Sequence, residues 1–105
     1  MILGVYTIFD TACSVADRPM VARSDGELLR VFSDLCVSAE HRFGQHPEHY
    51  SLFKIGEFDD TKMFIVPLET GPECLATGIE MVKLQQKVAK ENGELDAPIS
   101  DGALV

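Results

Sequence analysis

Basic residues are scarce in this sequence. Nine lysines and arginines stand against 17 aspartates and glutamates, so the 105-residue chain has a formal net charge of −8. A domain that binds duplex DNA through its phosphates needs a basic patch. Here the bases Arg18, Arg23, Arg30, Lys54 and Lys62 are interspersed with acids. The charge balance therefore argues against non-specific duplex binding.

Catalytic motifs are also absent. The sequence has no glycine-rich phosphate loop, no Gly-Lys-Ser/Thr and no Gly-x-Ser-x-Gly, which are the usual signatures of nucleotide hydrolysis and serine-hydrolase chemistry. His46 and His49 stand three residues apart, after His41, but no cysteine or carboxylate completes a known metal-ligand pattern nearby. We interpret these histidines as part of a polar loop. We therefore expect no enzyme activity, no catalytic residue, no metal site and no cofactor.

Cysteine is infrequent and odd in number. Cys13, Cys36 and Cys74 lie far apart, and a disulfide framework would leave one of them over, so reduced thiols are expected. Cys36 and Cys74 fall among apolar neighbours in predicted helices, which favours buried, inert thiols over nucleophiles. The three carboxylates within residues 57–60 favour a solvated turn over a cation site.

Long apolar runs are missing as well. No segment approaches the ~20 apolar residues of a membrane span. The N-terminus is apolar but has no basic leader and no small-residue cleavage site. We expect a soluble, unexported protein without membrane contact, with room for one compact domain.

The first half of the chain predicts two strands and a helix. Residues 2–10 are rich in β-branched and aromatic side chains on both faces, which predicts a strand. Pro19 begins a second, short strand that ends at Ala22. Ser24 and Glu27 have the spacing of a capping box, so a helix should begin there. Its apolar stripe consists of Leu28, Val31, Phe32, Leu35 and Ala39.

The second half predicts a hairpin and another helix. Residues 50–58 and 63–66 read as strands joined by the turn 59–61. Thr70 and Glu73 repeat the capping-box spacing, which predicts a helix to about Asn92 with Gly93 as its αL cap. The expected fold is α+β in ββαββα order, a small antiparallel sheet of three to four strands with one helix packed on one face and a second helix at the C-terminus. Residues 1–93 form the domain, and residues 94–105 read as an acidic disordered tail.

The predicted second helix has two apolar stripes. Leu75, Ile79, Val82 and Ala89 form one stripe, and Met81, Leu84 and Val88 form another, roughly 140° away around the helix. Because the first stripe can cover the sheet, we expect the second to form the interface of a homo-oligomer. The alternative is that both stripes are buried in one small core.

Aromatic and basic residues in the first 54 positions suggest contact with single-stranded DNA. Single strands are held by aromatic platforms beside cations, and Tyr50 with Arg18, Arg23 and Lys54 would supply both. Strand alternation must, however, bury at least half of the aromatic side chains. Core packing is therefore the competing interpretation.

Two segments resemble a known phage family. VYTIFDTACSVADRPMVARSDGELLRVFSD and HPEHYSLFKIGEFDD are similar to the small nonstructural protein of gokushovirus-type microviruses, which are circular single-stranded DNA phages. The likeness covers about residues 4–60 and includes, in order, the first strand, a Pro-x-x-Ala-Arg segment, an Arg-x-Phe-Ser-Asp helix and a His-Pro-Glu loop. The region beyond Thr61 departs from the family pattern.

The resemblance implies a role in phage DNA replication or at the switch to single-strand production, in the host bacterial cytoplasm and not in the virion. It supplies no catalytic residues. Two functions stay open. In one, the protein contacts single-stranded viral DNA weakly through Arg18, Arg23, Lys54 and Tyr50. In the other, it is an oligomeric adaptor for phage or host replication proteins that binds no DNA. The acidic balance favours the adaptor, whereas the family resemblance favours DNA contact.

Overall fold

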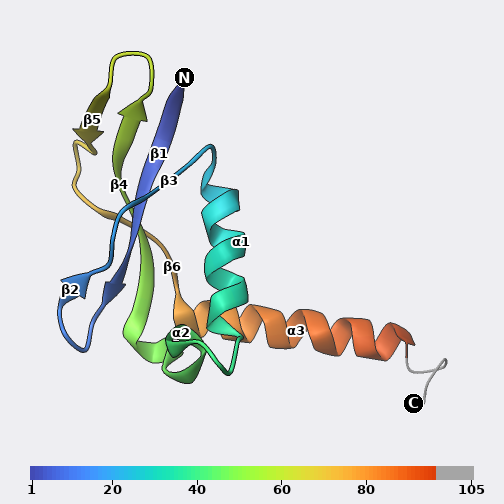
Figure 1. Cartoon of the computed structure of the whole chain (residues 1–105). Helices are drawn as coiled ribbons and strands as arrows, with labels where there is room; N and C mark the ends of the chain where they lie inside the picture. The colour runs from blue at the N-terminus through green and yellow to red at the C-terminus, as the bar shows by residue number, and fades with distance from the viewer. Residues whose placement is uncertain (97–105) are drawn as a thin grey trace.

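The protein folds into one antiparallel sheet with helices on one of its sides (Figure 1). A computed structural model describes the backbone of residues 1–96 and the side chains of residues 1–90. The elements are, in chain order, β1 Ile2–Asp10, β2 Val15–Ala16, β3 Met20–Ala22, α1 Asp25–Cys36, α2 Arg42–Gln45, a 3-10 turn at Pro47–His49, β4 Tyr50–Asp59, β5 Phe64–Pro67, β6 Glu73–Thr77 and α3 Gly78–Asp96.

The sheet is built around β1 and β4, which pair along their full lengths. On the outer edge of β1, β3 pairs with residues 4–6 and β2 with residues 9–10. On the outer edge of β4, β5 pairs with residues 56–59 and β6 with residues 51–54. Every pairing is antiparallel. The α+β class, the antiparallel sheet and the β4–β5 hairpin are confirmed, while β2 and β6 are strands that the sequence did not predict.

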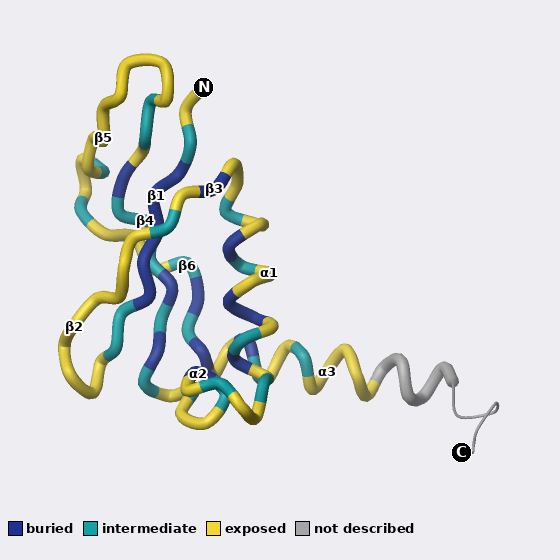
Figure 2. The backbone as a smooth tube through the Cα atoms, in the orientation of Figure 1, coloured by how far each residue is buried: buried dark blue, intermediate teal, exposed yellow. Residues whose placement is uncertain are grey.

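The core lies between the sheet and α1. Leu28, Phe32 and Cys36 follow one another at helical spacing and are buried together with Tyr6, Ile8 and Leu52 of the two central strands. Phe32 and Leu52 have no exposed surface, and burying such a side chain contributes roughly 1.5–3 kcal/mol. Figure 2 shows buried residues along α1, whereas the β5 hairpin and the outer part of α3 are mostly exposed.

The predicted Ser24 cap at the start of α1 is confirmed, while Glu27 reaches back to the amide before the cap residue and not to that of Ser24 itself. The Glu27 amide donates to the Ser24 hydroxyl oxygen at 3.3 Å, and the Glu27 carboxylate accepts from the Arg23 amide at 3.3 Å. The helix ends at Cys36, three residues before Ala39, the last residue of the predicted apolar stripe. There the Val37 amide donates to the Ser33 carbonyl oxygen and closes the last turn.

The predicted start of the last helix is wrong. Residues 73–77 form β6, paired with β4, although Thr70 and Glu73 have the capping-box spacing. The functional capping box is Thr77 with Glu80: the Glu80 amide donates to the Thr77 hydroxyl oxygen at 3.2 Å, and the Thr77 amide donates to the Glu80 carboxylate at 2.8 Å. The two boxes have the same spacing, so sheet pairing decides which of them starts the helix.

The predicted end of this helix is also wrong. α3 continues through Gly93 to Asp96, so Gly93 is not its αL cap. A disordered tail was expected at residues 94–105. Residues 94–96 belong to α3 instead, and residues 97–105 lie outside the described residues.

The His-Pro-Glu loop supports the start of α3. A side chain at position 78 would overlap the Pro47 carbonyl oxygen, so only glycine allows the 3-10 turn to approach the β6–α3 junction this closely. Farther along, the Gln85 side-chain amide donates to the buried Ser33 hydroxyl oxygen of α1 at 2.8 Å. These contacts fix the direction of α3, whose outer part projects away from the sheet (Figure 1).

Candidate nucleic-acid interface

A groove runs between the β2–β3 edge of the sheet and the helices α1 and α2. It consists of two hollows of about 310 Å³ and 270 Å³ that share Ile8, Asp17, Arg42 and Phe43 as lining residues. The first hollow extends toward Cys13 and Tyr50, and the second extends along α1. The lining is mostly apolar, with charged residues that include Asp17, Arg18 and Arg42, which is the usual composition of a ligand site.

An ion pair crosses this groove between its two hollows. The Arg42 guanidinium donates to the Asp17 carboxylate at 2.5 Å, with 57% and 43% of the two side chains exposed. The backbone of Asp17 is held in place, because its carbonyl oxygen accepts from the Thr7 hydroxyl and its amide donates to the Ile8 carbonyl oxygen. The guanidinium also lies over the Phe43 ring, 5.2 Å from its centroid. Such a cation beside an aromatic ring can bind a phosphate and stack on a base.

Of the three predicted DNA-contacting cations, only Arg18 lies in this groove. It is exposed and lines the second hollow beside His41 and Arg42. Arg23 is also exposed, beyond the other end of β3. Lys54 lies on β4, on the far side of β1 from β3, and its ammonium nitrogen is 3.8 Å from the Asp25 carboxylate. The structure thus does not join the three cations into one surface.

Tyr50 is not the exposed aromatic platform that we expected. Its exposed fraction is 9%, and its ring centroid lies 4.5 Å from that of Phe43. It touches the groove only as part of the wall of the first hollow. Packing between β4 and α2 buries the ring, which follows from the strand alternation that was the competing interpretation.

Asp25 lies at the centre of a polar cluster on the helix-facing side of the sheet. It accepts a hydrogen bond from the Tyr6 hydroxyl at 2.6 Å and faces the Lys54 ammonium group. Burial raises the pKa of Tyr6, and the hydrogen bond to Asp25 raises it further. A side chain at Gly4 would overlap the Tyr6 ring. The cluster joins β1, β4 and α1, so Lys54 has a structural role.

The predicted oligomer stripe on α3 is divided by burial. Met81 is 9% exposed and belongs to the core with α1, whereas Leu84 and Val88 are 52% and 42% exposed. Met81 is therefore corrected to a core residue, because the first turns of α3 pack on the protein body. Leu84 and Val88 lie on a face of α3 that is exposed, whereas Gln85 of the same helix still contacts Ser33 of α1.

A row of lysines on α3 went unnoticed in the sequence. Lys83, Lys87 and Lys90 recur at i, i+4 and i+7, which places them on one face of the helix, and all three are exposed. No aspartate or glutamate occurs from Met81 to Lys90. The 3.6-residue periodicity applied to charge, in addition to apolar residues, would have found this row.

The other candidate chemical groups are dispersed. Within residues 1–90, no three His, Cys, Asp or Glu side chains gather in a group that could hold a metal ion. Burial raises the pKa of Cys36 to about 11, so its thiol stays protonated. Cys74 lies on β6 and is exposed, which corrects its predicted helical and buried position. No helix of the described part has the length and apolar character to span a membrane.

Comparison with known proteins gives one family match. A family model described as "Phage ORF5 protein" matches residues 3–81, which is most of the chain and includes β1 through the start of α3. No curated protein and no solved structure matches the chain. The match extends beyond residues 4–60, the part of the sequence that carries the resemblance to the microvirus protein.

Proposed function

Because this chain belongs to the phage ORF5 protein family, we propose that it is a nonstructural phage protein that assists viral DNA replication or single-strand production through weak contact with single-stranded DNA. The phage of the proposal is of the microvirus type, on the basis of the two segments that resemble its small nonstructural protein. The protein acts in the host cytoplasm, outside the virion and without a catalytic step of its own.

The observation that carries this proposal is the lysine row on α3. Lys83, Lys87 and Lys90 span about 10 Å along the helix at 1.5 Å per residue. The row therefore presents three positive charges on one face, each of which can neutralise a phosphate of a bound strand. All three lysines are exposed, and Lys87 and Lys90 lie beyond Gln85, whose side chain contacts Ser33 of α1. A strand can therefore reach the row without displacing another element.

The groove supports a preference for single strands. Unpaired bases expose their faces, which stack on aromatic rings and on guanidinium planes. Arg42 over Phe43 provides such a plane, and Arg18 stands on the same rim. A phosphate that binds Arg42 has to compete with Asp17 for the guanidinium. This competition, together with the net charge of −8, is the physical reason for weak binding.

The test is the affinity for a labelled single-stranded oligonucleotide, measured beside the matching duplex at low salt. We expect weak binding with a preference for the single strand. The triple change of Lys83, Lys87 and Lys90 to glutamine should weaken it about tenfold or more, because lost phosphate contacts reduce counterion release. The triple change of Arg18, Arg23 and Lys54 to alanine should have a smaller effect, through Arg18 and Arg23.

The paired changes His46→Ala and His49→Ala serve as the control and should leave binding unchanged. These two rings stack on each other, 5.4 Å apart, in the loop before β4. Absence of affinity for single strands at low salt would overturn the proposal of DNA contact.

A second function, an adaptor for phage or host replication proteins, is favoured by the apolar side chains exposed on α3. Leu84 and Val88 lie one turn apart on an exposed face of α3, a spacing suited to a partner's apolar groove. In this case the replication proteins should co-purify with the tagged wild-type chain and not with the double variant Leu84→Glu/Val88→Glu. Neither chain should bind the oligonucleotide. Recovery that the double change leaves unaltered would reject the adaptor function.

A further inference from the structure

The β4–β5 hairpin has an apolar outer strand. Phe64, Ile65 and Val66 of β5 are 59%, 67% and 56% exposed, and the strand carries no charge up to Pro67. Among the described residues β5 pairs only with β4, so its other edge is free. Exposed apolar edge strands tend to pair with another strand. We propose that β5 pairs with β5 of a second copy of this chain, antiparallel about a twofold axis at Ile65.

The backbone direction of β5 selects Ile65 as the centre. The Leu68 amide donates to the Ile55 carbonyl oxygen of β4, so Leu68 faces β4. Backbone groups in an antiparallel strand point alternately to one edge and the other. Val66 and Phe64 therefore face β4 as well, whereas Ile65 and Pro67 face the free edge. Because Pro67 has no amide hydrogen, Ile65 alone between Phe64 and Pro67 offers both a donor and an acceptor there.

A twofold axis at Ile65 makes the contact self-complementary. Two Ile65 residues then exchange their amide and carbonyl hydrogen bonds, and Phe64 of each copy lies opposite Val66 of the other. Lys62 precedes β5 in the hairpin turn and Glu69 follows it, so the antiparallel twofold pairing brings the end of the strand that carries Lys62 in one copy toward the end that carries Glu69 in the other. The twofold axis thus creates two pairs of opposite charges, each formed by Lys62 of one copy and Glu69 of the other. These pairs offset part of the repulsion between two chains of net charge −8.

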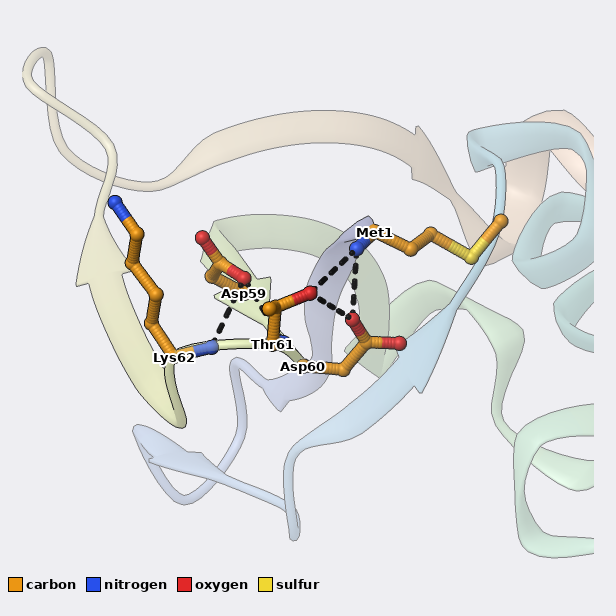
Figure 3. Close-up of polar contacts among 5 residues, drawn as sticks. All are labelled: Met1, Asp59, Asp60, Thr61 and Lys62. Carbon is orange, nitrogen blue, oxygen red and sulfur yellow. Dashed lines mark hydrogen bonds and ion pairs between the residues drawn. The ribbon is translucent and has the colours of Figure 1, made fainter.

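The hairpin tip is fixed in the shape that this pairing needs (Figure 3). The N-terminal ammonium group donates to Asp60 at 2.7 Å and to the Thr61 hydroxyl oxygen at 3.3 Å. The Asp59 carboxylate accepts from the amides of Thr61 and Lys62. The Lys62 side chain extends away from Met1 and Asp60 (Figure 3). Little conformational entropy is therefore lost on pairing, and the lysine stays available for the second copy.

The same geometry limits assembly to two copies. A twofold contact uses the free edge of both β5 strands, so no such edge is left for a third chain. The opposite edge of the sheet consists of the short strands β2 and β3, with Asp17 and Arg18 between them. Short edges bearing charge resist pairing. The expected product of the β5 contact is a closed dimer.

The test is sedimentation of the full chain over a range of micromolar concentrations. We expect a dimer for wild type and at least about tenfold weaker association for Ile65→Lys, as for a central apolar interface residue. Leu84→Lys is the matched control: it places the same charge at a position 52% exposed on α3, and it should leave the dimer intact. The proposal is overturned if the wild type is monomeric. It is also overturned if Leu84→Lys dissociates the dimer and Ile65→Lys leaves it intact.

A charge exchange tests the register without changing the apolar strand. Lys62→Glu alone and Glu69→Lys alone should each weaken the dimer, because like charges then meet at both ends. The double variant Lys62→Glu/Glu69→Lys should restore it. These positions lie in the exposed tip and beyond the strand, so the variants should fold. Failure of the double variant to recover association would exclude the twofold register at Ile65.

Discussion

At the scale of single residues, Tyr6 joins the sheet to α1. Its ring is 1% exposed, and its hydroxyl reaches Asp25 in the first turn of the helix. Gly4, two residues before it, leaves the space that the ring occupies. The sequence predicted neither the hydrogen bond nor the need for glycine, since both depend on the pairing of β1 with β3 and β4.

Tyr6→Phe should lower the free energy of unfolding by about 1–2 kcal/mol, because it removes a hydrogen bond to the Asp25 carboxylate. The loss is moderate because water can still solvate part of that carboxylate. Tyr50→Phe is the control: its hydroxyl makes no hydrogen bond to the side chains and backbone of the described residues, and the change should be close to neutral. Urea denaturation of both variants measures the difference. Equal effects for the two variants would contradict the role of Asp25.

The three thiols should differ in reactivity. Cys36 is 1% exposed and its pKa is raised to about 11 by burial, whereas Cys13 and Cys74 are exposed. A thiol reagent at about pH 8 should therefore modify two cysteines per native chain and the third only on unfolding, because the thiolate is the reacting form. Native-state modification of Cys36 at the rate of the other two would contradict its place in the core.

At the scale of elements, local sequence predicted the long strands and α1 because pattern and tertiary contact agree there. The alternation of residues 2–10 and the Ser24–Glu27 box both act within a few residues. β6 was missed because Thr70 and Glu73 offered an equally good helix start. Pairing with residues 51–54 of β4 overrides that signal. Gly71, with φ of +83°, turns the chain toward this position.

The hairpin tip should respond to pH at both ends of a defined window. The hydrogen bond between the N-terminal ammonium and Asp60 raises the pKa of the ammonium above 8.0 and lowers the pKa of Asp60 below 3.8. A lowered carboxyl pKa contributes stability that is present above 3.8 and lost as pH falls. A raised ammonium pKa contributes stability that is present below 8.0 and lost as pH rises.

The contact should therefore be complete between these two values and weaken outside them. NMR shifts of Asp60 and Thr61 followed across this range measure it. N-terminal acetylation should remove the alkaline response and leave the hairpin folded. Shifts that stay constant above pH 8 in the unmodified chain would contradict the ion pair.

At the scale of the whole molecule, charge is distributed unevenly, which the net value of −8 conceals. The residues 81–90 carry three lysines and no acid, whereas residues 91–105 carry four acids and no base. Sequence reasoning predicted Arg18 as a candidate contact. It did not find Arg42, because the pairing of Arg42 with Asp17 and Phe43 arises only when the β2–β3 edge meets α2. Lys54 and Tyr50 were expected to contact DNA, but Lys54 faces Asp25 and Tyr50 packs on Phe43, so both residues serve the fold.

The salt dependence of single-strand affinity tests the central claim, DNA contact through α3, most directly. For single strands the logarithm of the affinity falls with the logarithm of salt concentration with a slope of roughly −0.7 per phosphate neutralised. Replacing Lys83, Lys87 and Lys90 with glutamine should therefore reduce the magnitude of the slope by about 2, with the fold unchanged by circular dichroism. Equal slopes for the wild type and the variant would contradict DNA contact through α3. A wild type without measurable affinity for single strands at low salt would contradict it as well.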